Sequence, residues 1–118
     1  MTAPTVDINA STAVTITTPS FIVDAATEDQ PVIQLKNTSN DVSGPELRFV
    51  MDKGAAGAAN DSAGLITFYG DDAAQDNIKF GSIQVQVATH TNGQEGGKMA
   101  LGVANHDGGM GTGLLLED

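Results

Sequence analysis

Gly64-Leu-Ile-Thr-Phe-Tyr69 opens a series of β-prone stretches that decides the fold. In each stretch apolar residues alternate with polar ones or run together, and turn-forming residues bound it. The others are Glu46-Leu-Arg-Phe-Val-Met51, Ile78-Lys-Phe80 running on to Ile83-Gln-Val-Gln-Val87, and Lys98-Met-Ala-Leu-Gly-Val103. No helical pattern interrupts them. The spacing predicts an all-β protein, a single-domain antiparallel β-sandwich or jelly roll of about six to eight short strands.

Two local signals predict how these strands connect. The apolar positions change from even to odd between Ile78-Lys-Phe80 and Ile83–Val87, with Gly81-Ser82 at the changeover. A β-bulge there would return the apolar side chains to one face, and would bend the strand so that it could serve two sheets. Asn92-Gly93 is a strong hairpin signal, so we expect Ile83–Val87 and the Lys98 stretch to pair antiparallel.

Both ends of the chain point to contacts with neighbouring copies. We predict an extended N-terminal arm over residues 1–20 and the β-sandwich domain over residues 21–118. In the arm Val14, Thr15, Ile16 and Thr17 form a short β-prone run, which would anchor the protein by adding a strand to a neighbouring sheet. Further short strands are expected at 21–23 and 31–36. Leu114, Leu115 and Leu116 predict a last strand that is buried on both faces or pressed against another subunit.

Composition favours self-association. The chain has 118 residues, enough for one domain, but only four Phe, one Tyr and no Trp. Its aliphatic core would therefore be thin, and a small chain with a thin core often needs partners to reach working stability. We expect a homotrimer, in which the Leu114–Leu116 surface is buried.

Charge and cysteine content exclude several classes of partner. The net charge is −10, the wrong sign for neutralising phosphates, so nucleic acid is not an expected partner. The same charge would favour a basic patch on a docking protein. The chain has no cysteine and hence no disulfide framework or thiolate metal site. Neither a leader pattern nor an apolar stretch of membrane-spanning length is evident, and no membrane is expected as a partner.

No residue set has the pattern of a catalytic, cofactor-binding or metal site. Asp71, Asp72 and Asp76 lie near Asn77 but lack the spacing of an EF-hand; a solvated acidic turn is expected, with a Ca²⁺ site as the alternative. Two isolated histidines, His90 and His106, are too few for a zinc site. Asp52–Gly64, rich in small residues, predicts a solvated loop with the alternative that it contacts a ligand or neighbour. We therefore expect a protein that is not an enzyme.

Six short motifs follow one another along the chain: Pro31-Val-Ile-Gln-Leu-Lys-Asn-Thr38, Gly44-Pro-Glu-Leu-Arg-Phe49, Asp52-Lys-Gly-Ala-Ala-Gly57, Gly64-Leu-Ile-Thr-Phe-Tyr-Gly-Asp71, Gly96-Gly-Lys-Met99 and Val103-Ala-Asn-His-Asp-Gly108. In this order they resemble a β-rich module of structural and tail-fibre-like proteins from tailed bacteriophages, especially marine and cyanobacterial ones. The resemblance covers about residues 31 to 116.

The resemblance implies an exterior virion component, made in the host cytoplasm and usually homotrimeric. This chain is short and has no repeats or coiled-coil heptads, so a head-decoration (cement) protein that contacts the major capsid protein or other virion proteins is expected. The alternatives are a module of a tail fibre or appendage, or a module that binds a host receptor or glycan. Few aromatic residues are available for stacking on sugar rings, which weakens the glycan alternative.

Overall fold

A computed structural model describes residues 6–106 and 108–118, and these contain four β-strands and no helix. The chain divides into two units, of which one ends at Pro45 and the other is Glu46–Asp118. All four strands belong to the second unit. The predicted all-β class is therefore confirmed, while the boundary predicted at residue 20 remains a prediction about the assembled protein.

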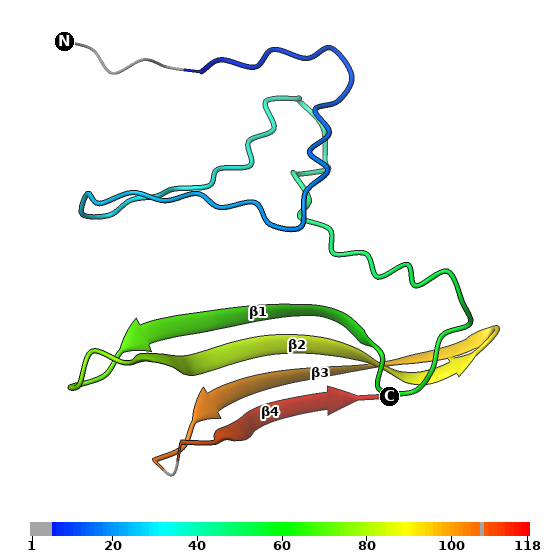
Figure 1. The fold of residues 1–118 in the computed structure, drawn as a ribbon. Helices are drawn as coiled ribbons and strands as arrows, with labels where there is room; N and C mark the ends of the chain where they lie inside the picture. Colours follow the sequence, from blue (N-terminus) through cyan, green and yellow to red (C-terminus); the bar gives the residue numbers. More distant parts are fainter. Residues whose placement is uncertain (1–5, 107) are drawn as a thin grey trace. The chain divides into compact units, whose positions relative to one another are not determined.

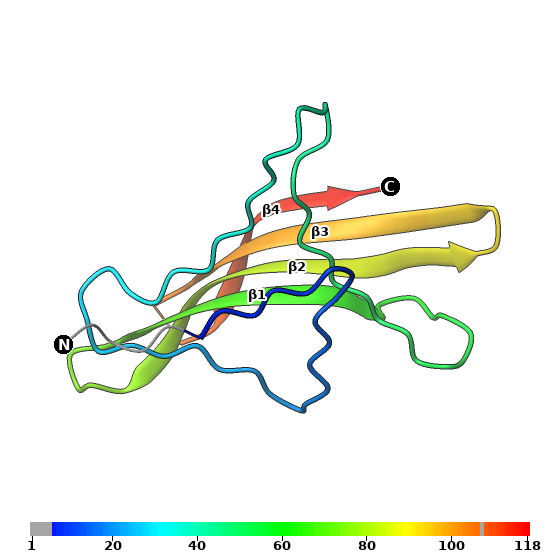
Figure 2. The ribbon, with the colours of Figure 1, turned by 90° about the horizontal axis from the view of Figure 1, so that it is seen from above.

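The strands form one antiparallel sheet in chain order, as Figures 1 and 2 show. They are β1 (Ser62–Asp71), β2 (Asn77–Thr91), β3 (Gln94–Ala104) and β4 (Met110–Glu117). Consecutive strands are neighbours throughout, so every connection is a hairpin. The β2–β3 hairpin turns at Asn92-Gly93, where Gly93 adopts a φ of 77°, and this confirms the turn predicted from the sequence.

Bulges keep the apolar side chains of the long β2 strand on one side. The pairing of β1 with β2 shifts between Phe68 and Tyr69, where Phe80 is the extra residue. This is the bulge that the parity change predicts, displaced by one residue from Gly81. It does not carry β2 into a second sheet, because the described residues form only one.

The β2–β3 hairpin is longer than the strands beside it. Backbone pairing outside the hairpin ends at Val87, which bonds to Asn60 and Asp61, and at Gly97, which bonds to Asp118, so residues 88–96 project as a two-stranded ribbon (Figure 2). A projecting ribbon exposes most of its side chains to water. All of residues 89–95 are accordingly exposed.

The strands predicted at 13–17, 21–23, 31–36 and 46–51 are not strands in this structure. Between described residues of the first unit, the backbone–backbone hydrogen bond is from Gln30 N to Thr27 O at 3.1 Å, within a turn. β-propensity describes how a side chain fits a pleated surface, and it cannot create a strand without a neighbouring strand to pair with. The coarse prediction of an antiparallel sheet thus holds, with four strands among the described residues. None of these residues lies in a helix long and apolar enough to cross a membrane.

Candidate subunit interface

Cross-strand register collects the apolar side chains of all four strands on one side of the sheet. Ile66 is opposite Ile83, Ile83 is opposite Leu101, and Leu101 is opposite Leu114. Residues paired in this way point to the same side. We call this side the apolar face; it comprises Ile66, Phe68, Ile83, Val85, Met99, Leu101, Val103, Leu114 and Leu116.

The opposite side of the sheet, the polar face, carries mostly hydrogen-bonding side chains. Its members are Thr67, Ser82, Gln84, Gln86, Lys98, Thr112 and Glu117. Leu65 and Leu115 are the apolar exceptions, on either side of Gln84 and Ala100. An antiparallel sheet with one polar and one apolar side normally packs the apolar side against another layer.

No described side chain is buried in the single chain, and no core is present. Within the apolar face Phe68 is 54% exposed, Val103 60% and Leu116 55%. Seven of its nine members are at least 37% exposed, so most of this apolar surface is open to water. A sheet whose apolar side is uncovered offsets little of the entropy lost on folding, so this face is a candidate surface for packing against another layer.

Phenylalanine rings of the apolar side lie over glycines. A Cβ added to Gly70 would come 3.5 Å from the Phe80 ring, and one added to Gly81 would come 3.7 Å from the Phe68 ring. The missing side chain leaves room for the ring, and the ring covers the backbone that glycine would otherwise leave open to water. Both pairs lie near the bulge at Phe80.

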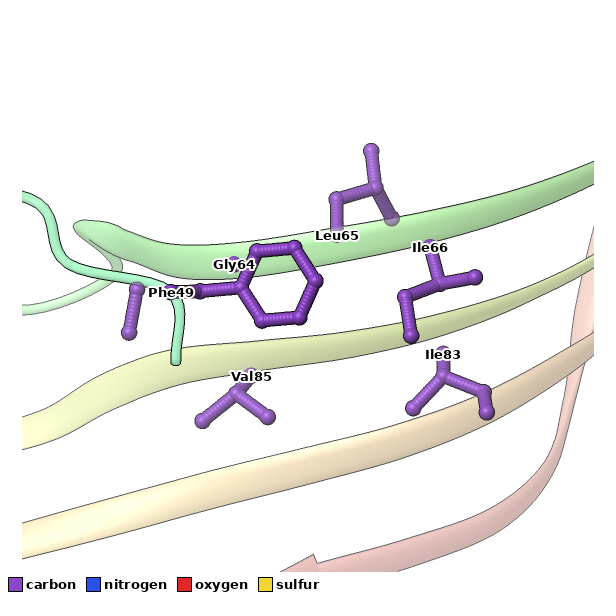
Figure 3. A pocket seen from close by; sticks show the side chains of 7 residues that line it. Phe49, Gly64, Leu65, Ile66, Ile83 and Val85 are labelled. Atoms are coloured by element: carbon purple, nitrogen blue, oxygen red, sulfur yellow. The ribbon is translucent and has the colours of Figure 1, made fainter. Parts of the chain in front are cut away.

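Phe49 makes the tightest of these contacts. A Cβ on Gly64 would lie 3.1 Å from the Phe49 Cβ and 3.3 Å from its Cγ. The ring occupies the end of the apolar face beside Ile66, Ile83 and Val85, and together these residues line an open hollow of about 220 Å³ (Figure 3). Residues 46–51, predicted as a strand, thus contribute a side chain to this face without entering the sheet.

A second hollow, the Gly97 hollow, shares Val85 with the first and extends from there across β3 and β4. It measures about 460 Å³, and its lining combines apolar and charged residues: Val85, Gly97, Lys98, Met99, Leu116, Glu117 and Asp118. A Cβ added to Gly97 would meet nothing within 4 Å. This glycine, in contrast to Gly64, has no ring over it.

The structure divides the predicted interface residues between the two faces. Leu114 and Leu116 belong to the apolar face, whereas Leu115 is opposite Ala100 on the other side. All three are about half exposed, at 47%, 49% and 55% in chain order. Their predicted burial against another subunit remains a prediction.

The predicted arm residues lie in the first unit and form no strand. Val14 is 54% exposed and Ile16 58% exposed, and Thr15 and Thr17 are exposed as well. Their backbone groups are open to pair with an added partner, as strand addition requires. The predicted anchoring role remains untested.

The Asp52–Gly64 segment is exposed over residues 52–60, as predicted for a solvated loop, and it is also hydrogen-bonded to the sheet, with its last three residues in β1. Asn60 N donates to Val87 O at 2.8 Å and Val87 N donates to Asp61 O at 2.9 Å. Gln86 Nε2 and Lys98 Nζ, each at 3.2 Å, donate to the backbone and side-chain oxygens of Asn60. Asn60 has a φ of 69°, a left-handed conformation that Asn tolerates better than most residues.

An ion pair closes the same segment from its other side. Lys53 Nζ lies 2.7 Å from Asp61 Oδ2, which also accepts a hydrogen bond of 2.7 Å from Ala58 N. The hydrogen bond from Lys53, followed by that from Ala58, lowers the pKa of Asp61 below its ordinary value. These bonds serve the local fold and assemble no nucleophile, base or oxyanion site.

The Asp72 side chain organises the acidic turn between β1 and β2 by accepting hydrogen bonds from the backbone of the turn. Asp72 Oδ1 accepts hydrogen bonds from Ala74 N at 2.8 Å and from Asp76 N at 3.0 Å. Among the described residues no group of three or more His, Cys, Asp or Glu side chains converges as a metal site would require. His90 lies in the projecting hairpin and His106 in the β3–β4 connection.

Sequence reasoning assigned the glycines of this chain mainly to turns and missed their pairing with rings. A Gly-Leu or Phe-Gly step inside an alternating strand was the available signal, because glycine in a strand interior often marks a close approach of another group.

No protein-family model, curated protein or solved structure matches the chain.

Proposed function

We propose that this chain is a non-enzymatic structural protein of a tailed-bacteriophage virion, a homotrimer that decorates the exterior of the head. The observation that carries self-assembly is the uncovered apolar face in a chain without a single buried described residue. The assignment to a virion rests on the motif resemblance between residues 31 and 116.

Association completes the β-sandwich in this proposal. The apolar faces of different copies, together with their residues 6–51, form the layers that a single chain lacks, at the spacing of about 10 Å typical of packed sheets. A stable interface commonly takes about 800 Å² from each partner. In this proposal the apolar face and the exposed apolar side chains of residues 6–51 together supply that area.

A tail fibre or appendage module is the second candidate function, and the projecting ribbon at residues 88–96 favours it. A ribbon that extends beyond its sheet presents exposed side chains at a distance from the interface, as contact with a host receptor requires. Loops and hairpin tips on a rigid scaffold commonly carry recognition.

Two measurements test the proposal. Multi-angle light scattering on the purified full chain at micromolar concentration is expected to give three times the 12.1 kDa chain mass. Quantitative mass spectrometry of phage particles is expected to give hundreds of copies for head decoration, and a few tens at most for a tail module. A stable monomer would remove the basis for self-assembly, and absence from the particles would refute the virion assignment.

A further inference from the structure

We propose that the Gly97 hollow receives the Phe21 ring of a second copy of this chain. The inference rests on the proposed self-assembly and specifies its contact. Its first basis is the repeated pairing of phenylalanine with glycine: Phe49, Phe68 and Phe80 each lie against a glycine of the sheet, at Gly64, Gly81 and Gly70 respectively.

Gly97 resembles the three glycines that phenylalanine rings cover, but a Cβ added to it would meet nothing within 4 Å. It is paired with Val87 and lies on the same side as Met99, two residues further along β3. Its φ is outside the left-handed region, so the backbone has no conformational need for glycine there. Glycine inside a strand costs about 0.5–1 kcal/mol relative to alanine, and close approach by another group explains such a position.

Phe21 is the remaining phenylalanine of the chain, which has four. It is 67% exposed, beside Ile22 at 79%, in a segment that forms no strand. An aromatic ring is a large apolar group with few rotatable bonds, so seating it against the apolar side chains of this hollow is favourable and costs little conformational entropy.

A second copy is the occupant because the Gly97 hollow is part of the apolar face, which is uncovered in the single chain and is the proposed subunit interface. Stable complexes bury roughly 800 Å² on each partner. An arm residue that reaches onto the neighbour's face adds area in the same contact. In a ring of three copies each chain would insert its Phe21 into the Gly97 hollow of the next chain, so every Gly97 hollow would be filled.

Cysteine cross-linking tests the contact directly, because the natural chain has no cysteine. We would prepare a tagged Phe21→Cys chain and an untagged Gly97→Cys chain, mix them through a dissociated state, and treat them with a short bismaleimide. The expected product joins tagged to untagged chains. Phe21→Cys mixed with Ala100→Cys, on the other side of the sheet, is the matched control and is expected to give no product.

Dissociation measurements give an independent readout. Phe21→Ala is expected to raise the protomer concentration at half-dissociation at least about tenfold. Gly97→Val, which fills the hollow, is expected to do the same, and the double variant to be no weaker than either single one. Ile22→Ala controls for loss of an exposed apolar side chain in the same segment.

The outcomes separate this inference from the proposed function. If the wild-type chain is a trimer but the mixture of Phe21→Cys and Gly97→Cys chains gives no product joining tagged to untagged chains, the Phe21 contact is overturned and self-assembly stands. A wild-type monomer overturns both. A cross-link between chains together with non-additive weakening establishes the contact.

Discussion

Replacing Gly64 by alanine should destabilise the protein only while Phe49 is present. The new Cβ would lie 3.1 Å from the Phe49 Cβ and 3.3 Å from its Cγ, closer than side chains normally approach, so the ring must move. Phe49 is 52% exposed. It therefore realises about half of the 1.5–3 kcal/mol available to a buried side chain, and Phe49→Ala should cost about 1 kcal/mol.

The two substitutions should be strongly coupled. In the natural background Gly64→Ala should lower the free energy of unfolding by most of that 1 kcal/mol, because the new Cβ displaces the Phe49 ring. Replacing glycine in a strand should raise it by about 0.5 kcal/mol. In the Phe49→Ala background only the gain remains, so Gly64→Ala should stabilise by about 0.5 kcal/mol. The expected coupling free energy is about 1 kcal/mol, well within reach of a double-mutant cycle.

Urea unfolding of all four proteins at one fixed protomer concentration measures this coupling, because the stability of an assembling protein depends on concentration. Gly111→Ala is the control: its nearest neighbour would be Val103 O at an ordinary 3.8 Å, so its effect should not depend on Phe49. If Gly64→Ala changed stability by the same amount in both backgrounds, the packing of Phe49 on Gly64 would be refuted.

Three further predictions concern the interface, the arm and the loop. Leu101→Asp should dissociate the proposed trimer, because an unpaired buried charge costs about 3–5 kcal/mol, whereas Gln84→Asp on the polar face should not. If light scattering gave the trimer mass for both variants, the apolar interface would be contradicted. Deletion of residues 2–20 should leave a folded β-sheet by circular dichroism but greatly weaken binding to phage particles, and undiminished binding would show that the arm is passive. Lowering the pH should weaken the hydrogen bond from Ala58 N to the Asp61 carboxylate. The pKa of Asp61 is lower in the folded state than in the unfolded state, so this stabilisation is complete above the unfolded pKa and is lost as the pH falls through the folded pKa. The protection factor for hydrogen exchange at the Ala58 amide, measured between about pH 2 and 6, checks this, with Asp61→Asn as the control. A protection factor that varied with pH no more than that of Asp61→Asn would contradict it.

The sequence by itself determined the all-β class and the hairpin at the centre of the sheet. Alternation in Ile83–Val87 and in the Lys98 stretch, the Asn92-Gly93 turn and the parity change near Gly81 are local signals of strand, hairpin and bulge, and β2 and β3 follow them. Local signals suffice there because consecutive strands are neighbours, so each pairing needs only the adjacent hairpin.

Only the tertiary structure decided which β-prone stretches become strands and where the rings go. Residues 13–17 and 46–51 have the same propensity as the strands of the sheet, yet they lack a backbone partner among the described residues, and propensity alone cannot supply one. The seat of Phe49 on Gly64 joins residues from a loop and a strand, and their fit depends on distances that no periodicity encodes. Close packing of this kind is a property of three-dimensional shape, which is why the glycines resembled turn residues in the sequence and are packing positions in the fold.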